Sequence, residues 1–255
     1  AVQAEKLTKL IKDSKITWNG AFGGEAIMLP VDGSLPQKML PGGMKLTLLS
    51  PAKRALQELK PQWEEEIKKA NLDFGFSMSP NDLELDDDEE LLGAEELPDM
   101  EALADSEFED DRSKANASSI AFLAEFDGRR LLLAADAHVG DLANAIDILS
   151  PDSALPVDLF KISHHGSKNT TSRELIEKVD CPTYAITTNG SIFKHPHQEA
   201  ISRVVMARDG DAQLLFNYRT KRNEIWDETK LKNKYGYRTI YPGAGEQGIM
   251  VDLEV

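Results

Sequence analysis

The chain has 255 residues, of which 41% are hydrophobic, and a formal net charge of −15. This length suits one or two domains, and the hydrophobic content suffices for a sizeable core. The single cysteine, Cys181, excludes an internal disulfide. Together with the lack of an opening signal sequence, it predicts a cytoplasmic protein. No stretch approaches the roughly 20 apolar residues needed to span a bilayer, so we expect no membrane association.

In the first 72 residues, helices are predicted over 2–16, 50–60 and 62–72. Strands are predicted over 26–29 and 45–49. The second helix is predicted to begin at Ser50 and Pro51, which suit the N-cap and the first helical position. Pro61 is predicted to end it, because a proline inside a helix removes a backbone hydrogen bond and clashes with the preceding turn.

Residues 73–114 are rich in charge and poor in aromatic residues. Between Asp82 and Asp111 there are 16 acidic residues and no lysine or arginine, and without them the chain has 28 acids against 29 bases. This composition predicts a solvated, mostly disordered insertion between residues 1–72 and 115–255. Because the acidity is confined to one segment, the rest of the surface is compatible with a basic groove for nucleic acid.

Strands and helices alternate again from residue 119 on, which predicts α/β layering. Asp127 and Gly128 predict the tight turn of a hairpin. The strands are expected over 120–126, 130–135, 158–163, 183–187, 213–217, 237–241 and 248–253. The helices are expected over 141–149, 172–179, 198–208 and 224–234.

Two apolar runs in this part end in side chains that bind metals. Residues 131–135 lead into Asp136, and residues 160–163 lead into His164 and His165. If the two strands are parallel neighbours, their tips meet at the same edge of the sheet, where Asp and His suit zinc, manganese or iron. The alternative interpretations are a turn or N-cap role for Asp136 and a surface loop for the histidine pair.

The remaining histidines have a functional and a structural interpretation each. Adjacent residues on an extended strand point to opposite sides, so the pair at 164 and 165 can face one ion only if the backbone turns, which Gly166 would permit. His195, in His195-Pro196-His197, is either a proton donor or phosphate contact in the active site, or a loop residue. His197 is a substrate contact or a helix cap. His138 is interpreted as a loop residue.

These motifs resemble the second half of a metallo-β-lactamase-fold hydrolase, in the ComEC-type branch named for the hydrolase domain of a bacterial DNA-uptake protein. The family pattern is Asn-x-x-Ser, a hairpin whose apolar strand ends in Asp, a strand ending in His-His-Gly-Ser, and a strand followed by His-Pro. The matching residues are Asn116 to Ser119, Asp136, His164 to Ser167, and His195-Pro196. Asn116 and Ser119 are interpreted as structural, and Lys194 stands where the family usually has Gly. The resemblance covers residues 16–50 loosely and 115–255 well.

The resemblance implies an α/β fold of the αββα sandwich type, of which this chain carries the second half. It implies two divalent metal ions, with zinc favoured over manganese, and it implies Asp136 and His165 as the ligands from this chain. The implied catalytic residues are His164 and His195, and the implied substrate contacts are Ser167, Lys168 and His197. The implied activity is that of a phosphodiesterase or nuclease that hydrolyses DNA with a metal-activated water.

One large departure limits this resemblance. The principal metal motif of the family, His-x-His-x-Asp-His, precedes the motifs above, but none of the five histidines of this chain precedes Asp136. Either another chain or a cleaved segment carries the first half, or the sequence is a fragment, or no full metal pair is bound. We predict a partner segment with the missing motif and consider proteolysis at the acidic insertion as a means of activation. The alternative is a catalytically degenerate module that binds a partner.

Overall fold

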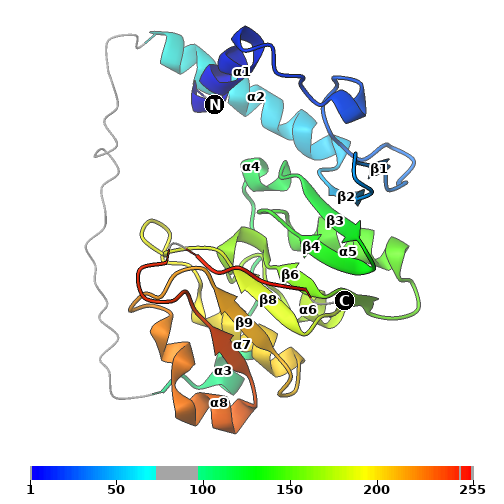
Figure 1. Ribbon diagram of the computed structural model, residues 1–255. Coiled ribbons are helices and arrows are strands. Elements are labelled where there is room, and N and C mark those ends of the chain that lie inside the picture. The colour runs from blue at the N-terminus through cyan, green and yellow to red at the C-terminus, as the bar shows by residue number, and fades with distance from the viewer. Residues whose placement is uncertain (1, 73–96, 247, 254–255) are drawn as a thin grey trace.

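A computed structural model describes residues 2–72, 97–246 and 248–253, and its centre is one mixed sheet of eight strands (Figure 1). The order across the sheet is β1-β2-β3-β4-β6-β8-β9-β10. Strands β1 to β4 pair antiparallel, whereas β4, β6, β8, β9 and β10 pair parallel. The bounds are β1 Gln37–Met39, β2 Lys45–Ser50, β3 Ala121–Phe126, β4 Arg129–Leu133, β6 Leu159–Lys161, β8 Thr183–Ile186, β9 Gln213–Phe216 and β10 Arg238–Ile240. The α/β class is therefore confirmed.

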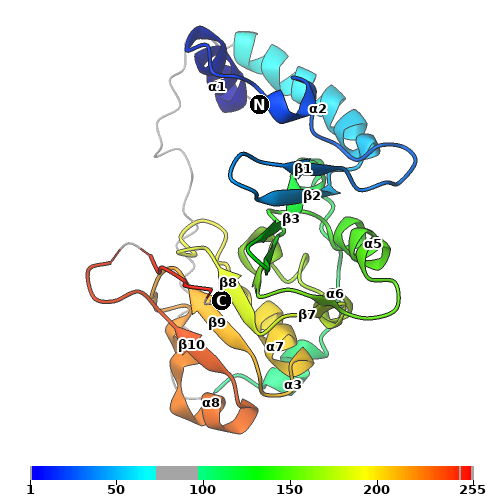
Figure 2. The ribbon, with the colours of Figure 1, turned by 45° about the vertical axis from the view of Figure 1, so that its right-hand side comes forward.

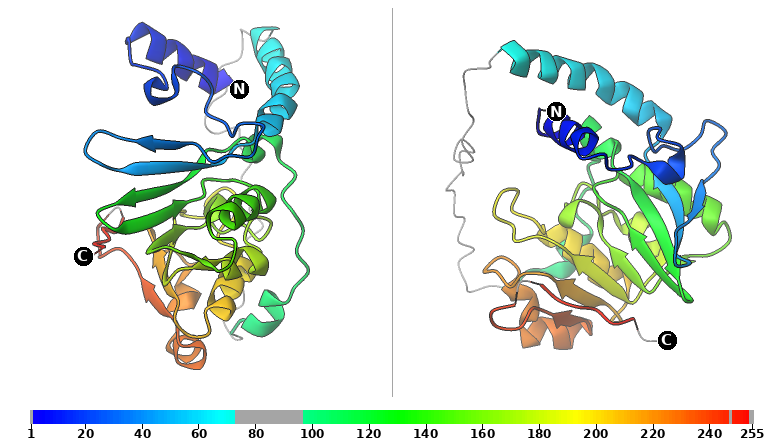
Figure 3. Two further views of the ribbon diagram at one scale, coloured as in Figure 1. Left: turned by 90° about the vertical axis from the view of Figure 1, so that its right-hand side faces the viewer. Right: turned by 45° about the horizontal axis from the view of Figure 1, so that its top comes forward.

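Helices cover one face of the sheet (Figures 2 and 3), and the hydrophobic core lies between these helices and the strands. The helices on this face are α3 Met100–Ala104, α5 Val139–Leu149, α6 Arg173–Glu177 and α7 Gln198–Ala207. Leu132, Phe160, Tyr184 and Leu214 lie side by side in register across β4, β6, β8 and β9, and all four are fully buried. Burial of each such side chain stabilises the fold by roughly 1.5–3 kcal/mol, so this row fixes the parallel strands beneath the helices.

The opposite face of the sheet is less covered. Leu131 and Leu133 alternate with Leu132 along β4, and they are only partly buried, as are Phe122 on β3 and Ala185 on β8. Residues 241–246 and 248–253 run along this side, away from the helices (Figures 1 and 3). In the described part of the chain, the second sheet is only the two-stranded pair β5 Leu155–Pro156 and β7 Val179–Asp180.

A helical pair lies beyond the β1–β2 edge: α1 Val2–Asp13 and α2 Lys53–Leu72 (Figure 1). The helix predicted over 2–16 is confirmed, but the predicted break at Pro61 is wrong, because α2 continues through it. A proline removes one backbone hydrogen bond, and exposed ion pairs support the turns that follow it, Lys60 with Glu64 and Lys69 with Glu65. Between the two helices lies a short 3-10 helix, η1 Gly20–Phe22.

The predicted helix start at Ser50 is also wrong, because Ser50 is the last residue of β2. Its buried hydroxyl donates to Ser119 O at 2.7 Å and accepts from Ala121 N at 3.2 Å. These bonds tie β2 to the start of β3 where the register shifts. A serine can cap a helix or pair with a neighbouring strand, and here the strand contact, 69 residues away in the chain, prevails.

Part of the predicted disordered insertion is ordered. Residues 73–96 lie outside the described residues, but residues 97–114 contain α3 and lead into α4 Lys114–Ala117. Asp99 caps α3 by accepting from Ala102 N, and Ser113 caps α4 by accepting from Asn116 N. Met100 and Ala104 are buried. Two helix caps and two buried apolar side chains therefore order a stretch whose overall composition is acidic.

The other predicted elements are mostly confirmed, with a few exceptions. The hairpin turns at Asp127 and Gly128, both at positive φ, as the sequence predicts. Residues 248–253 are not a strand, residues 26–29 form only an isolated bridge at Leu29, and β1 was not predicted. The last helical region consists of η4 Glu224–Asp227 and α8 Thr229–Tyr235. Among the described residues, every helix is too short or too polar to cross a membrane.

Candidate active site at the carboxyl ends of the parallel strands

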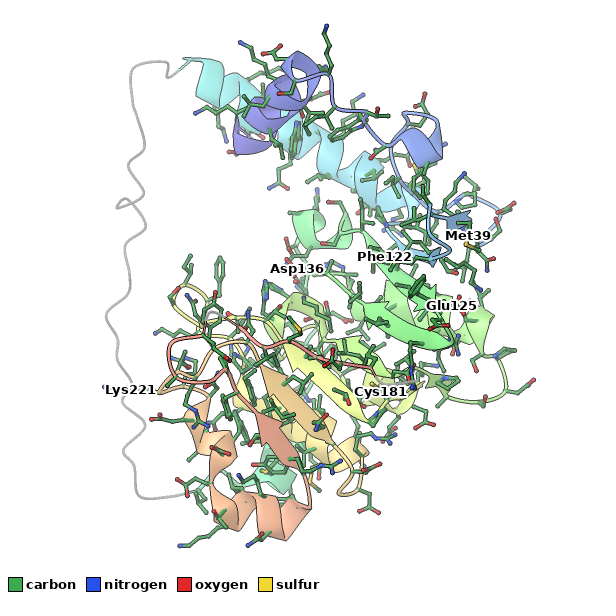
Figure 4. All side chains as sticks on the ribbon, viewed as in Figure 1. Met39, Phe122, Glu125, Asp136, Cys181 and Lys221 are labelled. Atoms are coloured by element: carbon green, nitrogen blue, oxygen red, sulfur yellow. The ribbon has the colours of Figure 1, made fainter. Side chains whose placement is uncertain are left out.

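Three loops meet where the parallel strands β4, β6 and β8 end, and Figure 4 labels Asp136 at this end of the sheet. His164 N donates to Ala135 O at 2.9 Å, and Ser163 Oγ donates to Ala137 O at 2.7 Å. His197 N donates to Gly166 O at 3.0 Å. These hydrogen bonds hold the Asp136 loop, the histidine-pair loop and the His195-Pro196-His197 loop together, as expected for the carboxyl edge of parallel strands.

The histidine pair lies in a left-handed turn. A 3-10 turn, η3 Ser163–His165, ends at Gly166, and φ is 44° at His164, 56° at His165 and 85° at Gly166. Consecutive left-handed residues are unfavourable for side chains with a Cβ, and such strain concentrates at functional sites. A Cβ on Gly166 would lie 2.9 Å from Pro196 Cβ, so only glycine fits the close approach of the two loops. The turn keeps the ring centroids of His164 and His165 6.4 Å apart, with an angle of 65° between the ring planes. The two imidazoles therefore do not point to opposite sides, as they would on an extended strand.

His165 faces Asp136. Its Nδ1 lies 2.8 Å from Thr187 O, and because a carbonyl only accepts hydrogen bonds, Nδ1 carries the hydrogen. The lone pair is then on Nε2, which lies 3.9 Å from Asp136 Oδ1. Burial and then the nearby Lys161 lower the pKa of His165, which favours the neutral imidazole that binds metals. Both side chains retain substantial exposure, 40% for His165 and 35% for Asp136, so the pair is open to a ligand.

Lys161 is a charged neighbour of this pair that the sequence analysis did not single out. It is the last residue of β6, and its Nζ donates to Ala135 O at 3.0 Å, next to Asp136. Burial lowers the pKa of Lys161, while the charge of Asp136 counteracts this effect. A partly buried ammonium group beside the Asp136 carboxylate can attract an anionic substrate to this edge of the sheet.

His164 has different neighbours from His165. Its Nδ1 lies 3.3 Å from Asn116 Nδ2 and 3.4 Å from Asp111 Oδ2. Asn116, interpreted from the sequence as structural, thus lies beside His164, and Asp111 was not predicted at all. The Asn-x-x-Ser motif gave the signal for Asn116. No local pattern identifies Asp111 within its run of acidic residues.

His195 and His197 continue a row of imidazoles from His164. The ring centroids are 4.8 Å apart between His164 and His195, and 4.7 Å between His195 and His197. His195 is only 6% exposed, and its Nδ1 is buried without a hydrogen-bond partner among the described residues. Burial, together with the surrounding imidazoles and Arg222, lowers the pKa of His195 to about 3. The neutral imidazole suits hydrogen bonding or metal ligation better than proton donation as a cation.

The predicted substrate contacts lie mostly within the loop scaffold. Ser167 is 4% exposed, and its Oγ accepts from Asn169 N. Lys168 N donates to His197 Nδ1 at 3.1 Å, and Lys168 Nζ bonds Glu199 at 3.1 Å. Their expected phosphate contacts therefore remain predictions, and phosphate would have to compete with Glu199 for the ammonium of Lys168.

The rim of the site carries an exposed aromatic side chain. Phe193 lies in the loop that leads to His195 and is 70% exposed. The ring centroids of Phe193 and His195 are 6.2 Å apart. At the base of this loop, a Cβ on Gly190 would lie 2.6 Å from His195 O and 3.2 Å from Arg222 Cδ. An exposed ring and the Arg222 guanidinium therefore flank the same loop.

The donor set fits part of a metal centre. No group of three or more His, Cys, Asp or Glu side chains in the described ranges is arranged to hold an ion. Zinc lies about 2.0–2.2 Å from nitrogen and oxygen ligands in a tetrahedral site, so two ligands of one ion are about 3.3–3.6 Å apart. The separation between Asp136 Oδ1 and His165 Nε2 is 3.9 Å, a few tenths of an ångström longer. A small side-chain rotation would bring the pair to the separation of two ligands of one ion, which would need further ligands.

Comparison with known proteins gives one informative similarity. The chain is 24% identical over 140 residues to ComE operon protein 3 of Bacillus subtilis (strain 168). The matched region is 52% of this chain and 16% of the relative. No model of a known protein family matches the chain, and no solved structure matches it.

Proposed function

We propose that this chain supplies the Asp136–His165 part of the active site of a metal-dependent phosphodiesterase, a nuclease that acts on DNA. The observation that carries this proposal is the geometry of His165. The carbonyl oxygen of Thr187 accepts a hydrogen bond from His165 Nδ1. The lone pair is therefore on Nε2, which lies 3.9 Å from Asp136 Oδ1. A backbone carbonyl behind an imidazole is the usual support of a histidine that ligates metal.

The side chains of this half have distinct roles in the proposed reaction. Asp136 and His165 would hold one of the two divalent ions, zinc or manganese. When bound, such ions favour ionisation of the attacking water and stabilise charge on the leaving oxygen. Lys161 attracts the phosphodiester, and His164 accepts or returns a proton at the reacting oxygens. The neutral His195 hydrogen-bonds the substrate or completes the ligand set.

The proposal includes a partner that carries the first half of the fold with its His-x-His-x-Asp-His motif, on another chain or a cleaved segment. Two features support it. In the described part of the chain, no third donor joins Asp136 and His165 at one ion, and the sheet face with Leu131, Leu133 and Phe122 is partly exposed apolar surface. A second sheet packed on this face would bury these side chains, as the two inner faces of a sandwich do.

DNA is favoured as substrate by the rim and by the resemblance of the motifs. The exposed ring of Phe193 offers a face on which an unpaired base can stack, and the nearby Arg222 can contact phosphate. The local similarity to ComE operon protein 3 supports the ComEC-type assignment. Proteolytic activation within the acidic stretch stays part of the proposal. However, a deletion designed to test it has to spare Asp111, which lies against His164.

The alternative is a degenerate binding module that keeps the fold and binds no metal. The observation in its favour is the lack, within the described ranges, of a third donor beside Asp136 and His165. This alternative gives no reason for the fixed tautomer of His165 or for the strained turn that presents it.

The test measures the metal content of the natively purified protein by elemental mass spectrometry. The intact mass of every co-purifying chain is determined on the same sample, and its hydrolysis of DNA is assayed. We expect about two equivalents of zinc or manganese together with a second polypeptide. Asp136→Asn should lower both metal content and hydrolysis, whereas Asp152→Asn, an exposed carboxylate in the loop after α5, should change neither. A chain that purifies alone, without metal and without hydrolysis, would establish the binding module instead.

A further inference from the structure

His197 lies at the start of α7, and the backbone of the neighbouring loop fixes its ring. Lys168 N donates to His197 Nδ1 at 3.1 Å. Because a backbone N–H only donates, Nδ1 carries the lone pair, and the hydrogen of the neutral imidazole is on Nε2. The ring of His195 packs against that of His197, with centroids 4.7 Å apart and an angle of 75° between the planes. His197 is thus held in one orientation as an N–H donor.

The His197 imidazole is neutral at pH 7 and above. Burial lowers its pKa, the charges of Lys168 and Arg222 add to this effect, and Glu199 counteracts it. His197 therefore carries a hydrogen on Nε2, whereas His165, whose hydrogen is on Nδ1, carries a lone pair there. The two histidines suit opposite partners, His165 a cation and His197 an anionic oxygen.

The guanidinium of Arg222 belongs to the same loop region. A Cβ on Gly190 would lie 3.2 Å from Arg222 Cδ and 2.6 Å from His195 O, so the stem of the arginine packs against the base of the loop. Arg222 is exposed, and among the described residues its side chain has no hydrogen-bond or ion-pair partner. An arginine that is held by its stem and unpaired at its head can bind an anion with two parallel N–H groups.

The first turn of α7 adds to the positive potential. This helix has ten residues, and no side chain caps its N-terminus at His197. The unpaired backbone N–H groups and the helix dipole favour an anion at this end. The acidic residue of the turn, Glu199, is paired with Lys168 Nζ at 3.1 Å, which balances its charge. The region around His197 therefore favours an anion.

We propose that the Nε2–H of His197 and the guanidinium of Arg222 form a subsite for one phosphate of a nucleic-acid strand, next to the reacting phosphate. The ring of His197 is two short steps from that of His164, since His195 lies between them at 4.7 and 4.8 Å. A strand carries a phosphate on every nucleotide, so a strand bound at the reacting edge offers a neighbouring phosphate here. The inference rests on the proposed function for the reacting phosphate, and it narrows the substrate to polynucleotides.

The first test is the tautomer of His197 in the full, ¹⁵N-labelled chain, measured with a chelator present by long-range ¹H–¹⁵N correlation NMR. A pH of about 8 keeps an imidazole of ordinary pKa, about 6.5, neutral. The chain has five histidines, so His197→Gln assigns the signals. We expect the Nε2–H pattern and a shift of the Nε2 signal when oligothymidylate is added. The Nδ1–H pattern, or no shift with saturating oligothymidylate, would overturn the inference.

The second test is the affinity for oligothymidylate at several salt concentrations, measured by fluorescence anisotropy with a chelator so that no hydrolysis occurs. We expect Arg222→Gln to weaken binding about fivefold and to reduce the slope of log K against log salt by about 0.7, the loss of one phosphate contact on a single strand. Arg238→Gln is the control, because Arg238 is an exposed arginine at the amino ends of the parallel strands β9 and β10. Equal slopes in all three proteins would overturn the subsite.

Hydrolysis by the loaded assembly separates a neighbouring phosphate from the reacting one. In Arg222→Gln, the ratio of kcat/KM for oligothymidylate to kcat/KM for bis(p-nitrophenyl) phosphate, which has a single phosphate, should fall about fivefold. An unchanged ratio would place Arg222 at the reacting phosphate and overturn the subsite, but it would leave the proposed function intact. The expected tautomer and salt slope in a chain that binds no metal would instead retain the phosphate subsite while the proposed function failed.

Discussion

The two sides of the site differ in what stands behind each histidine. On one side, the neutral carbonyl of Thr187 supports His165, whose free nitrogen faces Asp136. On the other side, Asp111 and Asn116 lie at Nδ1 of His164. A carbonyl fixes a tautomer without adding charge, whereas a carboxylate also stabilises the protonated imidazole. This difference supports the proposed division of roles, in which His165 ligates metal and His164 transfers protons.

Removing His165 should have the largest effect. His165→Ala deletes one of the two paired donors, so we expect zinc affinity to fall by more than about 100-fold, as measured by competition with a fluorescent chelator. His138→Ala, at the start of α5, is the histidine control and should bind zinc as the unmodified protein does. Equal loss in the two variants would remove the assignment of His165 as a ligand.

The matching change on the other side is His164→Gln. We expect DNA hydrolysis to fall by about 100-fold or more, since general acid–base groups contribute about 10²–10⁴ to rates. Zinc affinity should stay within about threefold of the unmodified value. A His164→Gln variant that loses metal but hydrolyses normally once metal is in excess would reverse the roles of the two sides.

The turn that separates the two sides can be strained further. Gly166→Ala places a Cβ 2.9 Å from Pro196 at a φ of 85°, so we expect a loss of about 1–3 kcal/mol in the free energy of unfolding, measured with denaturant. Gly140→Ala is the control, because Gly140 lies in helix α5 with open space around it. This control should be neutral or stabilise by about 0.5–1 kcal/mol.

His195, which lies against His164, should make stability depend on pH. Its pKa is lowered to about 3, against about 6.5 in the unfolded chain, so the unfolded state binds more protons between these values. The stabilisation is complete above about pH 6.5 and declines as the pH falls toward about 3. Between pH 7 and pH 5 we expect a loss of about 2 kcal/mol, which His195→Gln should largely remove.

Phe193 should have the smallest effect. Phe193→Ala should weaken the binding of single-stranded DNA by about fivefold, since stacking contributes about 1–3 kcal/mol per base. Fluorescence anisotropy in the presence of a chelator measures this binding without hydrolysis. Phe126→Ala, an exposed phenylalanine at the end of β3 near the hairpin turn, is the control. Equal affinity in all three proteins would place the strand away from the His195 side of the site.

The sequence by itself determined the order of most strands and helices, the hairpin at Asp127 and Gly128, and the meeting of Asp136 with the histidine loop. Apolar runs and turn residues are local signals, and parallel strands bring their tips to one edge whatever lies between them. The same signals could not place β1, whose three residues pair, among the described strands, with β2 alone.

Only the tertiary structure decided which neighbours the polar side chains chose. Ser50 bonds a strand instead of capping a helix, α2 continues through Pro61, and part of the acidic stretch folds against α7. Asp111 meets His164 from 53 positions earlier in the chain, within a run where every acidic residue looks alike. A carboxylate gains its role from the groups that fold around it. Here these are Asn116, Ser113 and two imidazoles, and no local pattern in the sequence specifies that set.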